Sequence, residues 1–153
     1  MLPHFHHVEP AFIMDGKIED MPIIDMEMAA SQVDQDMEFL RELIQDFMEE
    51  FNSKKESSTE LVKRMAKDKK AVKEVQSRAH AVKGSALNIA LRRVAALSLK
   101  LESQAKVYVS EDKCPSDEEA KAMGDVWDSL CNEATKVQEQ YDAMIKEKEK
   151  EED

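Results

Sequence analysis

Apolar residues recur at spacings of three and four along most of this chain, which is the pattern of amphipathic helices. A short first helix is predicted from Ile23 to Val33, where Ile24 and Met28 are four residues apart. Asp34 fits the N-cap of a second helix that runs through Met65, because its carboxylate can accept a free backbone N–H. The apolar stripe of this second helix contains Met37, Leu40, Leu43, Ile44, Phe47, Met48, Phe51, Leu61 and Val62.

The second half of the chain predicts two further helices. One begins after Asp68 and continues without a break through Leu101, with apolar positions at Val72, Val75, Ala79, Val82, Ala86, Ile89, Val94 and Leu97. The residues from Glu111 to Pro115 interrupt the pattern. Ser116 and Glu119 then form a capping box, in which each side chain accepts from a backbone N–H at the start of a last helix.

Short connections between amphipathic helices favour antiparallel packing. We therefore expect an all-α fold, an antiparallel up-down four-helix bundle with a short additional N-terminal helix, over residues 22–146. A coiled-coil dimer is the competing architecture, and separate stripes with caps between them disfavour it. Residues 1–21 hold two of the four prolines and lack helical periodicity, which predicts an irregular tail. Residues 147–153 predict a charged, fraying helix end.

Composition narrows the classes of partner and cofactor. Charged residues make up 36% of the chain and the net charge is -11, which disfavours nucleic acid or an anionic membrane as the main partner. With no secretory signal and no apolar run of membrane-spanning length, we expect a soluble intracellular protein with reduced Cys114 and Cys131. His4, His6 and His7 could bind a transition metal, but no cysteine lies near them in the sequence, and a tail without metal is favoured.

The candidate chemistry lies in the third predicted helix, which holds the only histidine outside the first seven residues. His80, Lys83 and Gly84 share one helical face, since residues three and four apart are neighbours. His80 lies about 100° around the helix from Ala79, at the edge of the apolar stripe. Gly84 lies on the solvent side, where it costs ~1 kcal/mol against alanine. We interpret the glycine as a position without a side chain, which gives the backbone of another protein access to the neighbouring imidazole.

A neutral imidazole nitrogen can attack phosphorus, and an ammonium one turn away can stabilise the charge on the phosphoryl oxygens. His80 is therefore the candidate phosphoacceptor and Lys83 the candidate electrostatic partner. The chain has only three glycines and no phosphate-binding loop, and its length leaves no room for a nucleotide-binding domain. We expect no autonomous kinase or ATPase activity.

The motif His80-x-x-Lys83-Gly84-Ser85, followed by an apolar helical run, resembles the histidine-containing phosphotransfer (HPt) proteins of multistep two-component phosphorelays. The resemblance covers roughly residues 22–145. In that family the motif is similar to His-x-x-Lys-Gly-Ser-Ser-x-x-x-Gly on the third helix of a four-helix bundle. Here Ala86 replaces the second serine and Ala90 the later glycine. Residues 91–101 resemble the family's continuation of the same helix.

The resemblance implies a carrier that accepts a phosphoryl group on His80 from a receiver-domain aspartate of a hybrid histidine kinase. It implies transfer onward to the aspartate of a response regulator, with Mg²⁺ held by the receiver and no cofactor on this chain. By the same resemblance, receivers dock over the first helix and adjoining faces of the next two, at Ile24, Met28, Met37, Leu40, Gly84, Ser85, Leu87 and Asn88. A monomer in the cytoplasm, with the nucleus as a second location, is expected.

One alternative from another class stays open, namely a helical adaptor or HPt-like scaffold that binds partners without phosphotransfer. The intact His80 and Lys83 favour phosphotransfer over this alternative.

Overall fold

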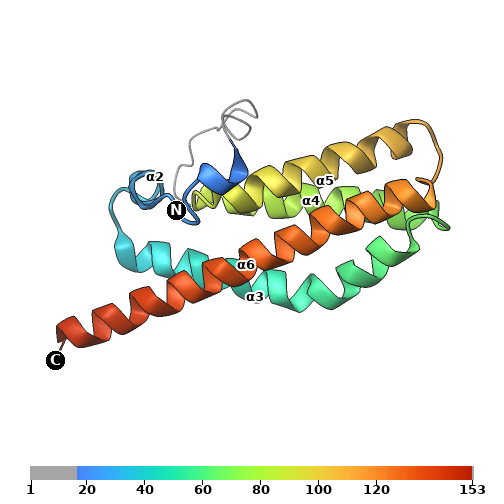
Figure 1. Cartoon of the computed structure of the whole chain (residues 1–153). Helices are drawn as coiled ribbons and strands as arrows, with labels where there is room; N and C mark the ends of the chain where they lie inside the picture. The colour runs from blue at the N-terminus through green and yellow to red at the C-terminus, as the bar shows by residue number, and fades with distance from the viewer. Residues whose placement is uncertain (1–16, 153) are drawn as a thin grey trace.

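The computed structural model describes residues 17–152, which form one 3-10 helix and five α-helices and contain no strand. The elements are η1 (Ile18–Asp20), α2 (Met26–Gln32), α3 (Met37–Arg64), α4 (Lys69–Asn88), α5 (Arg92–Ser110) and α6 (Asp117–Glu152). Four long helices, α3 to α6, pack side by side as an up-down bundle (Figure 1). The expected all-α bundle with a short N-terminal helix is confirmed.

Each long helix packs against the one that follows it, and α6 closes the bundle against α3. The side chains between the four helices form one core, because their apolar stripes all face inward. At one end, α2 lies against α3 and η1 lies against α5. The largest fully buried side chains are Leu40, Ile44, Met65, Leu91, Leu101, Met123, Leu130, Val72, Val94 and Val137.

Aspartate caps define where the first three α-helices begin. Asp25 and Asp68 accept from the backbone N–H groups of Met28 and Lys70 at 3.1 and 3.0 Å. The cap of α3 is Asp36, which accepts from the Phe39 N–H at 3.0 Å. The prediction of Asp34 at this position was wrong: its φ of 52° places it inside the turn that reverses the chain after α2.

The predicted continuous helix from residue 69 to residue 101 was also wrong. The chain reverses between Asn88 and Arg92, so that α5 returns antiparallel along α4. Ala90 adopts a left-handed φ of 55°, and the Leu91 N–H donates back to the Ala86 carbonyl at 2.9 Å, which closes the end of α4. The reversal buries the apolar residues of α5 against α4, where a straight helix would leave them without a partner.

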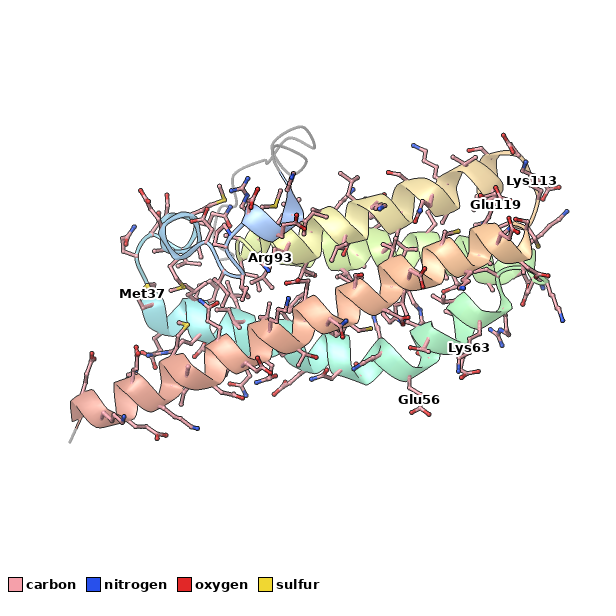
Figure 2. The ribbon with its side chains drawn as sticks, viewed as in Figure 1. Met37, Glu56, Lys63, Arg93, Lys113 and Glu119 are labelled. Carbon is pink, nitrogen blue, oxygen red and sulfur yellow. The ribbon has the colours of Figure 1, made fainter. Side chains whose placement is uncertain are left out.

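The N-terminal boundary differs from the predicted tail of residues 1–21. Residues 18–20 form η1, and Met21 is buried in the core. Arg93 of α5 fixes this segment, donating from Nε to the Met21 carbonyl at 2.6 Å and from Nη2 to the Glu19 carbonyl at 3.0 Å (Figure 2). His4, His6 and His7 lie outside the described residues. At the other end, α6 continues to Glu152, so most of the charge run from residue 147 is helical.

The two cysteines are not bonded to each other, and burial raises the pKa of Cys131 to about 11. Within residues 17–152, no helix is long and apolar enough to cross a membrane. The same residues contain no group of three or more His, Cys, Asp or Glu side chains arranged to hold a metal ion.

Replacing Ala90 by glycine should stabilise the protein by about 1 kcal/mol, because glycine adopts a left-handed φ without the steric cost that an L-residue carries. The matched control is Ala86→Gly in the same segment, where φ is helical and glycine should destabilise by ~1 kcal/mol or more. Urea denaturation of both variants measures the two effects. Destabilisation of equal size at both positions would contradict the assigned turn.

The junction of α5 and α6 predicts a pH effect on stability. Tyr108 Oη donates to Glu119 Oε2 at 2.6 Å, and the Ser116 N–H donates to Glu119 Oε1 at 2.9 Å. Figure 2 labels Glu119 at this end of the bundle, near the label of Lys113. The Tyr108 and Ser116 hydrogen bonds lower the pKa of Glu119 to about 2, and the bond to Glu119 raises the pKa of Tyr108 to about 12. The stabilisation from Glu119 is therefore complete above its ordinary pKa and is lost as the pH falls towards about 2.

Accordingly, the difference in Tm between the wild type and Glu119→Gln should shrink as the pH is lowered from about 6 to about 3. Glu118→Gln is the control, because it removes the same charge from the same helical turn without breaking the bond to Tyr108. A constant difference for Glu119→Gln across this pH range would show that the hydrogen bonds do not depend on its ionisation.

Candidate functional site

His80 lies in the middle of α4, one residue after the buried Ala79. Its side chain is 69% exposed, so the imidazole stands at the edge of the apolar stripe and faces solvent. Nδ1 lies 2.8 Å from Oε1 of Glu102, on the adjacent helix α5. Nε2 has no hydrogen-bond partner among residues 17–152. One ring nitrogen is thus held by the protein and the other is open to an incoming group.

Glu102 also pairs with Lys83, whose Nζ lies 2.7 Å from Oε2. The two side chains are only 17% and 15% exposed, so this ion pair is largely shielded from solvent. Burial acts to raise the pKa of Glu102, but the interactions with Lys83 and His80 outweigh it and the pKa is lowered. An ionised carboxylate therefore lies between the imidazole and the ammonium.

The sequence did not point to Glu102, which lies 22 residues after His80. Along the continuous helix that the pattern predicted, these residues would be about 33 Å apart at 1.5 Å per residue. Only the reversal at Ala90 brings them together. The one available signal is that Glu102 adjoins Leu101 in the apolar stripe, where a partly buried carboxylate requires a partner.

Gly84 is exposed, and a Cβ built on it would meet no atom within 4 Å. Packing therefore does not require glycine here, and neither does the helical backbone. The missing side chain leaves space on the solvent face of α4, one turn after the imidazole. This agrees with the interpretation that glycine at this position provides access.

A groove of about 630 Å³ runs between α3 and α4 beside the site. Ser85 and Asn88, two of the residues expected in the docking face, line its α4 side. Aromatic and aliphatic side chains of α3 line the opposite side, namely Phe39, Leu43, Phe47 and Phe51. The groove thus presents an apolar wall on its α3 side, and neither His80 nor Gly84 lines it.

The other expected docking residues divide into two groups. Met37 is 38% exposed, and Met28 and Leu87 are half-buried, so all three can contribute to a surface. Ile24 and Leu40 are only 3% and 0% exposed. These two residues form part of the core, where they hold α2 and α3 in the bundle, and their placement in an exposed docking face was wrong.

The end of α4 is held by α2. With its amide nitrogen turned toward α4, the buried Gln32 donates to the carbonyls of Asn88 and Leu87 at 2.6 and 3.1 Å. The Asp25 N–H donates to the Ala90 carbonyl at 3.1 Å. These bonds satisfy carbonyls that the end of a helix leaves free, and they fix α2 beside the segment that carries the candidate site.

The described residues thus form a four-helix bundle that presents an exposed imidazole, His80, beside a partly buried lysine, Lys83. The family model described as the Hpt domain matches residues 38–145, and the chain belongs to this family. No curated protein and no solved structure matches the chain. Hpt domains are phosphotransfer intermediates of two-component signalling, act as carriers, and interact with receiver domains. His80, Lys83 and Glu102 all lie within the matched residues.

Proposed function

We propose that this protein accepts a phosphoryl group on His80 from the receiver-domain aspartate of a hybrid histidine kinase and passes it to the aspartate of a response regulator. The exposed imidazole of His80 carries this proposal, since Nε2 has no hydrogen-bond partner within residues 17–152 and Lys83 lies one turn along the same helix. Lys83 is the electrostatic partner of the phosphoryl group. The metal ion and the acidic cluster for each transfer belong to the receiver.

The distribution of charge supports an acidic partner at this site. Residues 69–110, which include α4 and α5, hold nine Lys and Arg and only two Asp and Glu, a net charge of +7 in a chain whose total is -11. The acidic cluster of a receiver would be attracted to this pair of helices and repelled by the rest of the molecule. Charge complementarity of this kind accelerates encounter and suppresses wrong orientations.

We place the receiver over α2 and the groove between α3 and α4. Ser85 and Asn88 line the groove, Met28, Met37 and Leu87 supply partly exposed apolar side chains outside it, and Gly84 leaves the approach to His80 open. An exposed apolar surface rimmed by polar groups is typical of an interaction site. We further propose that the carrier acts as a monomer in the cytoplasm, with the nucleus as a second location.

His80→Gln should abolish phosphate acceptance from a phosphorylated receiver and leave the helical content unchanged, because the side chain is exposed and contributes little to the core. Acid-labile phosphate detection and far-UV circular dichroism measure the two results. The control is His6→Gln, which removes another histidine and should label like the wild type. Normal labelling of His80→Gln would move the phosphoacceptor elsewhere and would favour the adaptor alternative.

Gly84→Gln should stabilise α4 slightly, since a mid-helix glycine costs ~1 kcal/mol and a Cβ at this exposed position meets no atom within 4 Å. Transfer from a receiver should fall by about tenfold or more, equivalent to ~1.4 kcal/mol of lost binding. Phosphoramidate is much smaller than a receiver, so its labelling of His80 should be less affected.

The control for helix propensity is Gly124→Ala in α6, where a Cβ would meet only Val62 Cγ1, at 3.7 Å. This variant should gain stability without losing transfer. If Gly84→Gln leaves receiver-dependent transfer unchanged, the receiver approaches His80 from another side.

A further inference from the structure

The groove between α3 and α4 extends well beyond the Ser85 and Asn88 end that the receiver is proposed to cover. Its α3 side is lined from Phe39 to Ser58, about 28 Å of helix at 1.5 Å per residue. Its volume of about 630 Å³ lies within the range of small-molecule sites, roughly 300–1,000 Å³. A groove of this length and volume is narrow, so it accommodates an extended chain and not a compact ring system.

The apolar lining of the groove is built from aromatic rings in series. Phe47 and Phe51 stack with their ring centroids 6.1 Å apart, and the ring of Trp127, from α6, lies 5.8 Å from Phe51. Val82 contributes an aliphatic side chain from α4. The one polar atom of these side chains, Trp127 Nε1, already donates to Thr59 at 2.9 Å. This part of the groove therefore matches a hydrocarbon.

One end of the groove carries a guanidinium. Arg78 lines this end, and its Nη1 donates to the hydroxyls of Ser57 and Ser58 at 2.7 and 2.9 Å. Nη2 makes no hydrogen bond within residues 17–152, and Nε lies 4.0 Å from Glu74 Oε2, the outer limit of an ion pair. Ser58 is only 6% exposed, and its hydroxyl accepts from Arg78 without donating to another described residue. Unused donors thus face a group that can only accept.

The acidic residues that line the groove do not close this end to an anion. Glu50 pairs with Lys54 at 2.8 Å, so its charge is compensated. Glu74 is 60% exposed, and it can remain in solvent when another carboxylate replaces it at Arg78. Asp46 is exposed and lies about 12 Å along α3 from Lys54 at 1.5 Å per residue.

We propose that this groove binds one long-chain carboxylate, a free fatty acid, with its head on Arg78 and Ser58 and its chain extended towards Phe39. We propose further that the bound fatty acid excludes the receiver domain. Binding depends only on the groove. Exclusion of the receiver rests on the function proposed above, because the chain and the receiver would share the lining residues Ser85 and Asn88.

A carboxylate matches the free edge of the guanidinium. The Nε and Nη2 atoms of Arg78 lie on one edge, and an arginine edge binds the two oxygens of a carboxylate through parallel hydrogen bonds. An alkylamine of the same length would instead place its ammonium against the guanidinium. Since the chain has a net charge of -11, an anionic membrane surface is disfavoured as the source, and the free monomer is the ligand.

Trp127 is the only tryptophan of the chain and lines the groove, so its fluorescence reports occupancy. Titration of the full chain with laurate, below its micelle concentration, should give a saturable change in fluorescence. Laurate should also raise the Tm, because it binds the folded state. The alkylamine of the same length should bind about tenfold more weakly or worse. Caprate, whose chain is shorter, should bind more weakly by up to about fourfold per missing methylene.

Arg78→Gln should weaken laurate binding by about tenfold to a hundredfold, the effect of losing a charge-assisted hydrogen bond. Arg78→Lys keeps the charge and should recover part of this loss. Lys63→Gln removes a surface cation of α3 that does not line the groove, and it should bind laurate like the wild type. Binding of the alkylamine should not weaken in Arg78→Gln, which distinguishes a lost head-group contact from a damaged fold.

The effect on the receiver is measured by labelling of His80. At about ten times its Kd, laurate should slow labelling by a subsaturating phosphorylated receiver about tenfold. Labelling by phosphoramidate should not change, because His80 does not line the groove. In Arg78→Gln the same concentration of laurate should slow the receiver less.

The binding site, the exclusion of the receiver and the proposed function fail in different ways. Equal binding of laurate and the alkylamine, or equal laurate affinity of the wild type and Arg78→Gln, would overturn the carboxylate site. Laurate that binds without slowing the receiver would overturn the exclusion. Absence of labelling at His80 without laurate would overturn the proposed function, while the fluorescence and the Tm would still decide whether the groove binds a fatty acid.

Discussion

The reversal of the chain at Ala90 is the constraint on which the rest of the structure depends. It turns one long amphipathic stripe into two helices that bury it between them, and it supplies α4 and α5 of the bundle. It also brings Glu102 within 2.8 Å of His80. The turn is made without glycine, by an alanine at a φ of 55°, and α2 supports it through the Asp25 N–H, which donates to the carbonyl of Ala90. The short N-terminal helix is therefore part of what holds the site in place.

A second group of contacts holds the N-terminal segment on the bundle from the other side. Arg93 directs three nitrogens of its guanidinium at the Met21 carbonyl, the Glu19 carbonyl and the carboxylate of Glu133, the last at 3.5 Å. Because a planar guanidinium presents its donors in a fixed fork, one side chain can join η1, α5 and α6. The segment before α2 is thus held in a fixed position by Arg93. At the C-terminal end of α2, Gln32 donates to the carbonyls of Leu87 and Asn88 that end α4.

The periodicity of apolar residues was sufficient to predict the helical class, the Asp68 cap and the capping box at Ser116, because these depend on local sequence. It was insufficient for the reversal at Ala90, since no glycine or proline marks it and the apolar spacing continues across it. For the same reason Glu102 was missed. The cap of α3 was misplaced by two residues because Asp34 and Asp36 are equally good acceptors, and only the left-handed turn after α2 decides between them. Ile24 and Leu40 were assigned to the surface because a stripe alone does not show which of its residues another helix covers.

The position of Glu102 bears on what a carrier must do. A carrier has to accept the phosphoryl group and then release it, so a site that bound the group too firmly would stop the relay at His80. A lysine without a counter-ion would stabilise the phosphorylated state fully, but here Lys83 already has a partner at 2.7 Å, and the phosphoryl oxygens must compete for it. On the proposed function, the same carboxylate favours a positively charged ring, because its Oε1 lies 2.8 Å from Nδ1. On the proposed function these two effects oppose each other, so a partly buried carboxylate at this position keeps the phosphorylated and unphosphorylated states of His80 closer in free energy than the lysine alone would.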